Sequence, residues 1–212
     1  MDSLTDFALL AFTSIFAMVN PLGILPVYTG LTAKLPAKEA KHVAIKAIIT
    51  AIITLILFAI LGRFIFDFFA ISVNSLRIVG GVVFFMAGYD MLQARLIRTK
   101  SSDESVTEFA SDIAITPLAI PMICGPGAIT VSMILMNDAK DITHKLVLIG
   151  TIIFIMVITL VFLLSARKII KALGDNGNKV LMRIMGLIVM VIAVEFFLGG
   201  LRNYIIDLMK SV

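Results

Sequence analysis

The chain has 212 residues, of which 60% are hydrophobic and 15% charged, and its mean hydropathy is +1.08. Soluble domains carry about 25% charged residues, so a soluble globular protein is excluded. One cysteine and the dominance of apolar residues also exclude a disulfide scaffold and a disordered chain. The net charge of +4 forms no basic stripe, so we expect a lipid bilayer and no nucleic acid as partner.

Six apolar segments are long enough to cross a bilayer as helices, each of which needs about 20 residues. No segment shows the alternating polarity of a membrane β-strand. We therefore predict an all-α, polytopic membrane protein. Its six transmembrane helices are expected at residues 4–28, 43–69, 74–94, 113–136, 146–166 and 180–201.

Lysine and arginine are unequally distributed between the two sides of these predicted helices. Twelve fall on one side of the membrane and six on the other. Because cytoplasmic loops carry the excess of positive charge, the richer side is expected to face the cytoplasm. The sequence thus predicts a multi-pass protein of the cell (inner) membrane with both termini outside the cytoplasm.

The second half of the sequence resembles the first. Residues 77–83 align with 183–189 at an offset of 106, and weaker matches pair the other helices in the same order. We expect a first three-helix repeat at 1–99, a cytoplasmic linker at 100–112 whose stretch 100–105 is mobile, and a second repeat at 113–212. Because each copy has an odd number of spans, the second is expected to insert upside down.

Five of the six prolines lie in the first and fourth apolar segments, which are equivalent in the two repeats. Proline removes a backbone donor and clashes one turn back, so residues 20–23 and 125–128 are expected to break their helices. One isolated proline would give only a kink. Interrupted helices at equivalent positions of two repeats instead indicate the binding site of a secondary transporter.

The chemistry of these breaks suits a small zwitterion. A half-helix that begins at a break offers free N–H groups to a carboxylate, and one that ends there offers free carbonyls to an ammonium group. Asn20 and Thr130 are expected either to bind ligand groups or to cap and bridge helices. The predicted substrate-binding residues are Asn20, Pro21, Leu22, Gly23, Gly125, Pro126, Gly127, Ala128 and Thr130.

Ionisable residues inside membrane segments are candidates for coupling. Glu195 lies deep in the sixth segment and Asp90 near one end of the third, so each is a candidate for a proton relay. A neutral or helix-bridging carboxyl is the alternative. Four arginines at helix ends are interpreted as interfacial anchors that also bond carbonyls freed by the broken helices: Arg63, Arg77, Arg167 and Arg183.

The motifs at residues 20–23, 117–121, 125–129 and 77–81 resemble those of the MarC family, and the resemblance covers essentially the whole chain. The family consists of six-helix inner-membrane proteins and includes SnatA-type transporters of small neutral amino acids. The resemblance implies transport of glycine, alanine or similar amino acids, with residues 20–23 and 125–128 as the binding region.

The sequence contains neither a nucleophile with a base nor a cluster of metal-ligand spacing. We therefore expect no enzyme, no catalytic residue, no metal site and no cofactor. The alternatives to amino-acid transport are an exporter of drugs or other small solutes and a non-transporting membrane scaffold. The coupling ion, proton or sodium, the direction of transport and the oligomeric state are left open.

Overall fold

The structure is a computed structural model that describes residues 4–93 and 105–210. Within these two ranges every regular element is a helix, which confirms the all-α class. Except for Ser105, the stretch predicted to be mobile lies outside the described residues.

The first half of the chain forms helices with one sharp bend. α1 and α2 meet at an angle of 42° across residues 20–23, where the sequence predicts a break. Ser72 starts the last helix of this half, because its side chain accepts a hydrogen bond from the Ser75 N–H (3.0 Å). The elements are α1 (Leu4–Val19), α2 (Ile24–Leu31), α3 (Ala37–Phe68) and α4 (Val73–Leu92).

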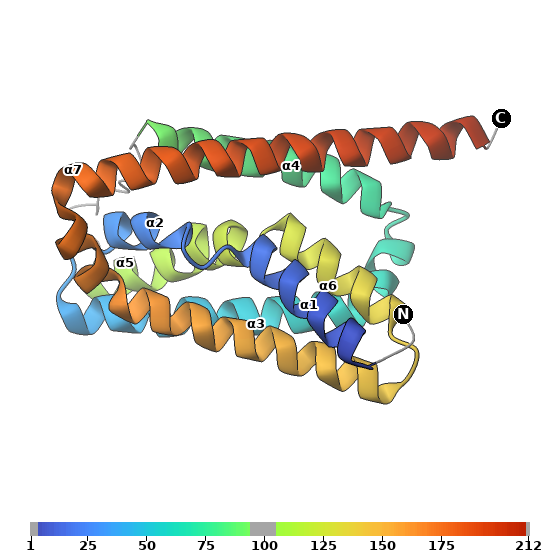
Figure 1. Cartoon of the computed structure of the whole chain (residues 1–212), viewed down its shortest axis with the longest axis horizontal. Helices are drawn as coiled ribbons and strands as arrows, with labels where there is room; N and C mark the ends of the chain where they lie inside the picture. Colours follow the sequence, from blue (N-terminus) through green and yellow to red (C-terminus); the bar gives the residue numbers. More distant parts are fainter. Residues whose placement is uncertain (1–3, 94–104, 211–212) are drawn as a thin grey trace.

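The second half contains a π-helix and one long helix that turns back on itself. The elements are α5 (Val106–Ile113), the π-helix η1 (Ala114–Ile123), α6 (Pro126–Asp138) and α7 (Ile142–Lys210). α7 reverses its direction at Gly174, whose φ of +68° and ψ of 174° are not helical (Figure 1). We call residues 142–173 and 175–210 the first and second arms of α7.

Five helical stretches of the described chain are long and apolar enough to cross a membrane, and the bent pair α1–α2 raises this number to six. Their length and composition are those of a multi-pass membrane protein. The predicted count of six is therefore reached when α1 and α2 together make one span.

The fourth predicted segment begins earlier than expected. α5 starts at Val106, whereas the hydrophobic pattern placed the start at residue 113. The Ser105 N–H donates to Glu108 Oε2 (3.0 Å) and the Glu108 N–H donates to Ser105 Oγ (3.1 Å). This reciprocal capping box starts a helix in a polar stretch that the hydrophobic pattern alone assigns to a linker.

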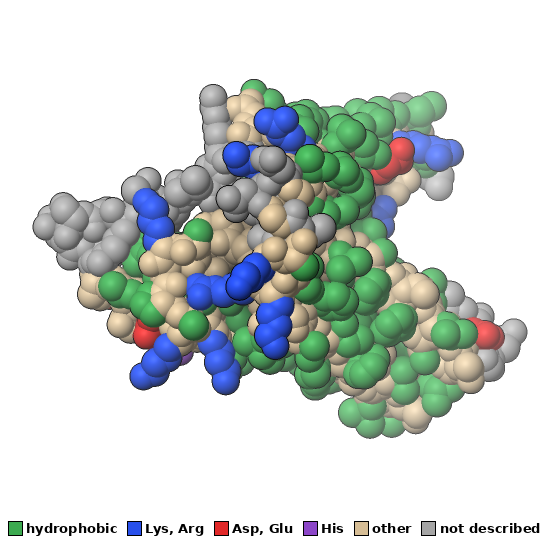
Figure 2. Space-filling view, turned by 60° about the vertical axis from the view of Figure 1, so that its left-hand side comes forward, with side chains coloured by type: hydrophobic (Ala, Val, Ile, Leu, Met, Phe, Trp, Pro, Cys, Tyr) green, Lys and Arg blue, Asp and Glu red, His purple; other side chains and the backbone are tan. Residues whose placement is uncertain are grey.

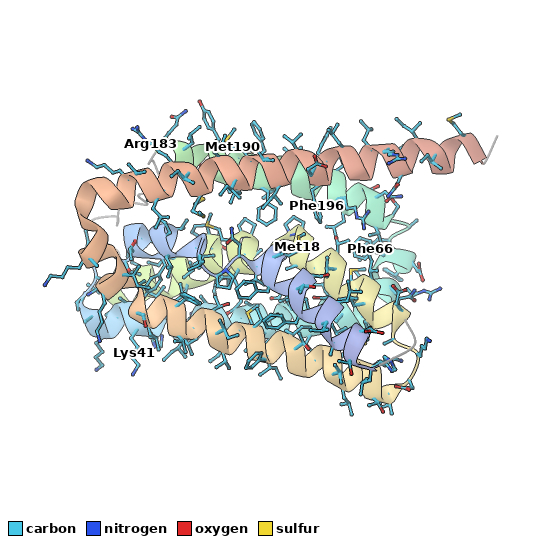
Figure 3. All side chains as sticks on the ribbon, viewed as in Figure 1. Met18, Lys41, Phe66, Arg183, Met190 and Phe196 are labelled. Carbon is cyan, nitrogen blue, oxygen red and sulfur yellow. The ribbon has the colours of Figure 1, made fainter. Side chains whose placement is uncertain are left out.

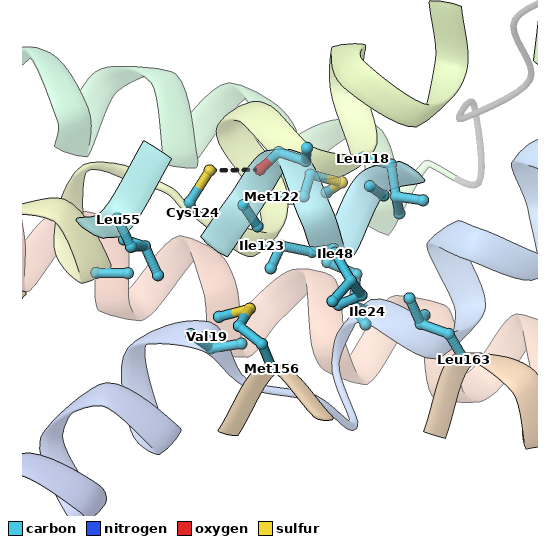
Figure 4. Close-up of a cluster of buried hydrophobic side chains, with 14 of the residues drawn as sticks. Val19, Ile24, Ile48, Leu55, Leu118, Met122, Ile123, Cys124, Met156 and Leu163 are labelled. Carbon is cyan, nitrogen blue, oxygen red and sulfur yellow. Dashed lines mark hydrogen bonds between the residues drawn. The ribbon is translucent and has the colours of Figure 1, made fainter. Parts of the chain in front are cut away.

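The helices form three layers (Figure 1). α3 and the first arm of α7 make one outer layer, and α4 with the second arm of α7 makes the other. The broken helices α1–α2 and η1–α6 lie between them. Figure 4 shows that side chains next to both breaks, among them Val19 and Ile123, share a buried cluster with Ile48 of α3 and Met156 of α7.

Small residues set the distance between α4 and the second arm of α7. A Cβ built at Gly81 would lie 2.7 Å from the Ala193 carbonyl oxygen, and one at Gly88 would lie 2.8 Å from the Gly186 carbonyl oxygen. The contacts move up one helix as they move down the other, so the two helices are antiparallel. Small residues spaced in this way let two backbones approach closely.

Among the described residues, lysines and arginines predicted to be cytoplasmic gather at one end of the molecule. Figure 3 labels Lys41 and Arg183 at the end where α7 turns back, and Figure 2 shows blue side chains on this end. Lys38 and Lys168 are exposed there as well. The predicted orientation requires such a basic end, and the sidedness itself stays a prediction.

Candidate functional site

The first break separates α1 from α2. Asn20 has a φ of +46°, a left-handed conformation that asparagine tolerates better than most residues. Its N–H donates to the Phe16 carbonyl (3.0 Å), and its side-chain Oδ1 accepts a hydrogen bond from the Gly23 N–H (3.1 Å). Asn20 therefore ends α1 and satisfies a donor at the start of α2. Of the two roles left open for Asn20, the structure has it in the capping role.

The second break separates η1 from α6 and carries no such cap. The Cys124 N–H and Sγ both donate to the Ala119 carbonyl, at 2.9 and 3.0 Å. Gly125 is extended, and Pro126 occupies the first position of α6, where a helix needs no N–H. Among the described residues, the N–H groups of Gly127 and Ala128 have no acceptor. The free donors predicted for a break are thus found at the second break.

The two breaks contact each other in the middle layer. A Cβ built at Gly127 would lie 2.8 Å from Met18 Sδ and 3.3 Å from Cζ of Phe196. Met18 is two residues from Asn20, and Figure 3 shows Met18 and Phe196 between the layers. The structure therefore brings together the two sequences that the prolines single out.

A small cavity borders the breaks. The volume open to the centre of a water molecule is about 40 Å³, whereas one water needs about 10–15 Å³ by this measure. The cavity therefore holds a ligand the size of a few water molecules. Its main lining residues are Met18, Asn20 and Gly23 from the first break, Met122 beside the second, and Phe84, Met91, Val189 and Ile192 from the α4 layer.

Two side chains separate this cavity from the second break. Phe84 packs against Gly125 so closely that a Cβ at Gly125 would overlap its ring, and Met18 covers Gly127. Gly80 of α4 contacts the Pro126 ring in the same way. Glycine at these positions lets α1 and α4 approach the second break, and the free N–H groups lie one side-chain layer behind the cavity wall.

Thr130 is buried on α6, and its hydroxyl has no hydrogen-bond partner in the part of the chain that the structure describes. Other helical threonines donate to the carbonyl four residues earlier, such as Thr159 to Ile155 (2.8 Å) and Thr151 to Val147 (2.8 Å). This back-bonding is the usual way to satisfy a hydroxyl inside a helix. An unpartnered buried hydroxyl costs about 1–3 kcal/mol, which makes Thr130 a ligand-binding candidate.

Of the predicted site residues, only Asn20 and Gly23 line the cavity. Six others are buried but do not line it: Pro21, Gly125, Pro126, Gly127, Ala128 and Thr130. Leu22 is 51% exposed and does not line it. Glu195 and Asp90, the candidates for coupling, are exposed on the second arm of α7 and on α4, and neither lines the cavity. The structure therefore does not bring these carboxylates to the breaks.

The arginines differ in their contacts. Arg167 Nη2 donates to the Thr32 and Leu35 carbonyls, at 3.1 and 2.8 Å. These carbonyls lie in the turn between α2 and α3, at the end of α2 away from the break, so the bonding of carbonyls freed at the breaks stays a prediction. Arg63 instead bonds the Asn137 side chain (2.8 Å).

The apolar part of the cavity wall was not predicted. Met18, Phe84, Met122, Val189 and Ile192 lie in segments where nearly every residue is apolar. Hydrophobicity does not distinguish a cavity-lining side chain from a lipid-facing one. The glycines at 80 and 81 were the available signal, because they permit close contact between α4 and its neighbours.

Comparison with known proteins gives a consistent family. The MarC family integral membrane protein model matches residues 5–205. A UPF0056 membrane protein of Methanocaldococcus jannaschii is 38% identical over 199 residues, which are 93% of this chain and 97% of the relative. One of Bacillus subtilis is 34% identical over 201 residues, with coverages of 93% and 95%. No solved structure matches the chain. The chain belongs to the MarC family of integral membrane proteins.

Proposed function

We propose that the protein is a secondary transporter of small neutral amino acids, with glycine and alanine as its substrates. The substrate binds at the paired helix breaks, and alternating access carries it across the membrane. The observation that carries this proposal is the contact between two helix breaks next to a small cavity, with the free N–H groups of Gly127 and Ala128 one side chain behind its wall.

The backbone supplies the binding groups. The N–H groups of Gly127 and Ala128 and the positive end of the α6 dipole bind the substrate carboxylate. Carbonyls at the ends of α1 and η1 bind the ammonium group. Met18 covers Gly127, so its side chain moves aside when substrate reaches these donors. Among the described residues, none with an ionised side chain lines the cavity, which suits a substrate without net charge.

The directions of the helices support alternating access. In Figure 1, α1–α2 runs opposite to η1–α6, α3 runs opposite to the first arm of α7, and α4 runs opposite to the second arm. An inverted repeat requires this relation between its equivalent segments. Two halves of opposite orientation around one central site can rock to open it first to one side and then to the other.

Coupling to a proton or a sodium ion would involve carboxylates outside the cavity. Glu195 and Asp90 are exposed and lie outside the cavity, so a proton relay through either would act at the surface of the helix bundle. We keep both as candidates, because an ionisable residue in a membrane segment is costly without a function.

The two alternative functions, export of drugs or other solutes and a non-transporting scaffold, require different features at the breaks. A drug-sized molecule needs a pocket of about 300–1,000 Å³, and the space for ligand beside the breaks is far smaller. A non-transporting scaffold needs no free backbone donors. Drug export or a scaffold role would therefore be favoured if the transport test finds no amino-acid uptake.

The test is uptake of radiolabelled glycine and alanine into proteoliposomes that contain the purified protein. Uptake is measured without a gradient, with an imposed proton gradient and with an imposed sodium gradient. Gradient-stimulated uptake that unlabelled glycine competes would support the proposal and identify the coupling ion. Uptake no greater than in protein-free liposomes under every condition would contradict it and favour solute export or a scaffold.

A further inference from the structure

A second cavity lies at the end of the molecule opposite the basic end, between the α3–α4 turn and the end of α6. Its volume open to water centres is about 360 Å³, against about 40 Å³ for the cavity at the breaks. Arg63, Asp67, Ile71, Ile134 and Asn137 are among its lining residues. The cavity is therefore large enough to hold a small molecule with several waters.

Groups of opposite polarity meet at this cavity. Arg63 Nη1 donates to Asn137 Oδ1 (2.8 Å), and Arg63 Nε lies 3.9 Å from Asp67 Oδ2. The Arg63 and Asp67 side chains are 78% and 75% exposed, so both are accessible to solutes. A guanidinium binds a carboxylate in a fork, and carboxylate and amide oxygens accept from an ammonium group. The set is thus complementary to an α-amino acid zwitterion.

One face of α6 connects this cavity with the second break. Gly127, Thr130, Ile134 and Asn137 follow each other at spacings of three, four and three residues, which places them in one stripe along a helix. Asn137 and Ile134 line the second cavity, and Gly127 is at the break. The unpartnered hydroxyl of Thr130 lies between them.

We propose that the second cavity is an entrance site that binds a small neutral amino acid before it moves along α6 to the breaks. Arg63 holds the carboxylate of the amino acid, and Asp67 with the Asn137 amide oxygen holds its ammonium group. Thr130 is the next hydrogen-bonding group on the route. The inference rests on the proposed function for its ligand class, but it concerns a site separate from the breaks.

The binding test uses a reporter cysteine that does not depend on transport. Ile71→Cys places a thiol in the cavity, because Ile71 lines it and is 47% exposed. The native Cys124 is fully buried and should not react with a charged methanethiosulfonate reagent. The rate at which the reagent modifies the Ile71→Cys thiol is measured on the purified protein in the presence of glycine. A parallel sample contains sucrose at the same osmolality.

We expect glycine to slow modification of Ile71→Cys several-fold. The same protection is expected in the double variant with Gly127→Leu, in which the site at the breaks is closed. Adding Arg63→Gln should abolish this protection. Ile142→Cys is the control, because Ile142 is 69% exposed and lies outside the cavity, so glycine should not protect it. No protection of Ile71→Cys, equal protection with Arg63→Gln, or equal protection of Ile142→Cys would each overturn the proposal.

A kinetic arm separates this proposal from the proposed function. Arg63→Gln should raise the KM for glycine uptake by about tenfold or more, as expected when a charged hydrogen bond is lost, and should leave the maximal rate nearly unchanged. Arg202→Gln, an exposed arginine outside the cavity, should change neither. If the unmodified protein takes up no amino acid, the proposed function fails, and the protection experiment still decides whether the entrance site exists.

Discussion

The two helix breaks have similar sequences and different local chemistry. At the first, the Asn20 side chain accepts a hydrogen bond from the Gly23 N–H, whereas the N–H groups of Leu22 and Ile24 have no acceptor among the described residues. At the second, no side chain caps α6, and the N–H groups of Gly127 and Ala128 have no acceptor among the described residues. The breaks therefore differ in one respect: a side chain bonds one of the donors at the first break, and no side chain of the described residues does so at the second.

Neighbouring side chains pack closely against the second break. Gly80 and Gly125 have no room for a Cβ, because Pro126 and Phe84 fill the space beside the second break. The buried hydroxyl of Thr130 lies one turn further along α6. Close packing and unpaired polar groups at one place are the features on which the proposed binding site rests.

The largest expected effect comes from closing the second break. Gly127→Leu would put a side chain against Met18 and Phe196, where even a Cβ is crowded. We expect glycine uptake to fall to the level of protein-free liposomes. Gly150→Leu is the control, because a Cβ there meets nothing within 4 Å. Normal uptake by Gly127→Leu, with a monodisperse and helical protein, would mean that the second break is not the site.

Removing the cover of the second break should change substrate selection. Met18→Ala would enlarge the cavity and expose Gly127. We expect uptake of valine relative to glycine to rise at least about tenfold, the discrimination that one or two methylene groups give in an apolar pocket. Met86→Ala, at a methionine that is 63% exposed and outside this cavity, should keep the original preference. An unchanged ratio in Met18→Ala would argue against Met18 as the cover.

A smaller effect is expected from the hydroxyl beside the second break. Thr130→Val keeps the shape and removes an unpartnered hydroxyl, so the free energy of unfolding should not fall. The KM for glycine should rise about fivefold, since one hydrogen bond contributes about 1 kcal/mol. Thr159→Val removes a hydroxyl that is bonded within its helix and should leave KM unchanged. A lower stability with an unchanged KM would make Thr130 purely structural.

The smallest effect on uptake is expected at the first break. Asn20→Ala removes the bond to Gly23 and puts alanine at a positive φ, so unfolding should become easier by about 1–2 kcal/mol. Asn20→Gly should lose less, since glycine accepts this conformation. Thermal unfolding of the purified proteins measures both. Loss of uptake in Asn20→Gly as complete as in Gly127→Leu would show that both breaks bind substrate alike.

The sequence predicted the class of fold and the places where helices break. Apolar length gave the membrane helices, and paired prolines gave residues 20–23 and 125–128. The start of α5 was missed, because a capping box in a polar stretch carries no hydrophobic signal. Residues 125–128 were expected to break their helix in the same way as residues 20–23. Only the structure shows that a side chain bonds a backbone N–H at the first break and that none of the described side chains does so at the second.

The sequence predicted the backbone breaks of the candidate site, but it did not predict the apolar side chains that line the cavity. Phe84 and Ile192 line the cavity through tertiary packing of α4 and α7, which apolar periodicity cannot specify when most residues are apolar. Arg63 was interpreted as an anchor for a similar reason, since its partner Asn137 is 74 residues away in the sequence.

The most direct test of the central claim is glycine counterflow. Proteoliposomes are loaded with unlabelled glycine and diluted into labelled glycine, which requires exchange through the protein and no knowledge of the coupling ion. We expect transient accumulation of label with the unmodified protein and with Gly150→Leu, and none with Gly127→Leu. Absence of counterflow in the unmodified protein, or equal counterflow in Gly127→Leu, would contradict transport at the paired breaks.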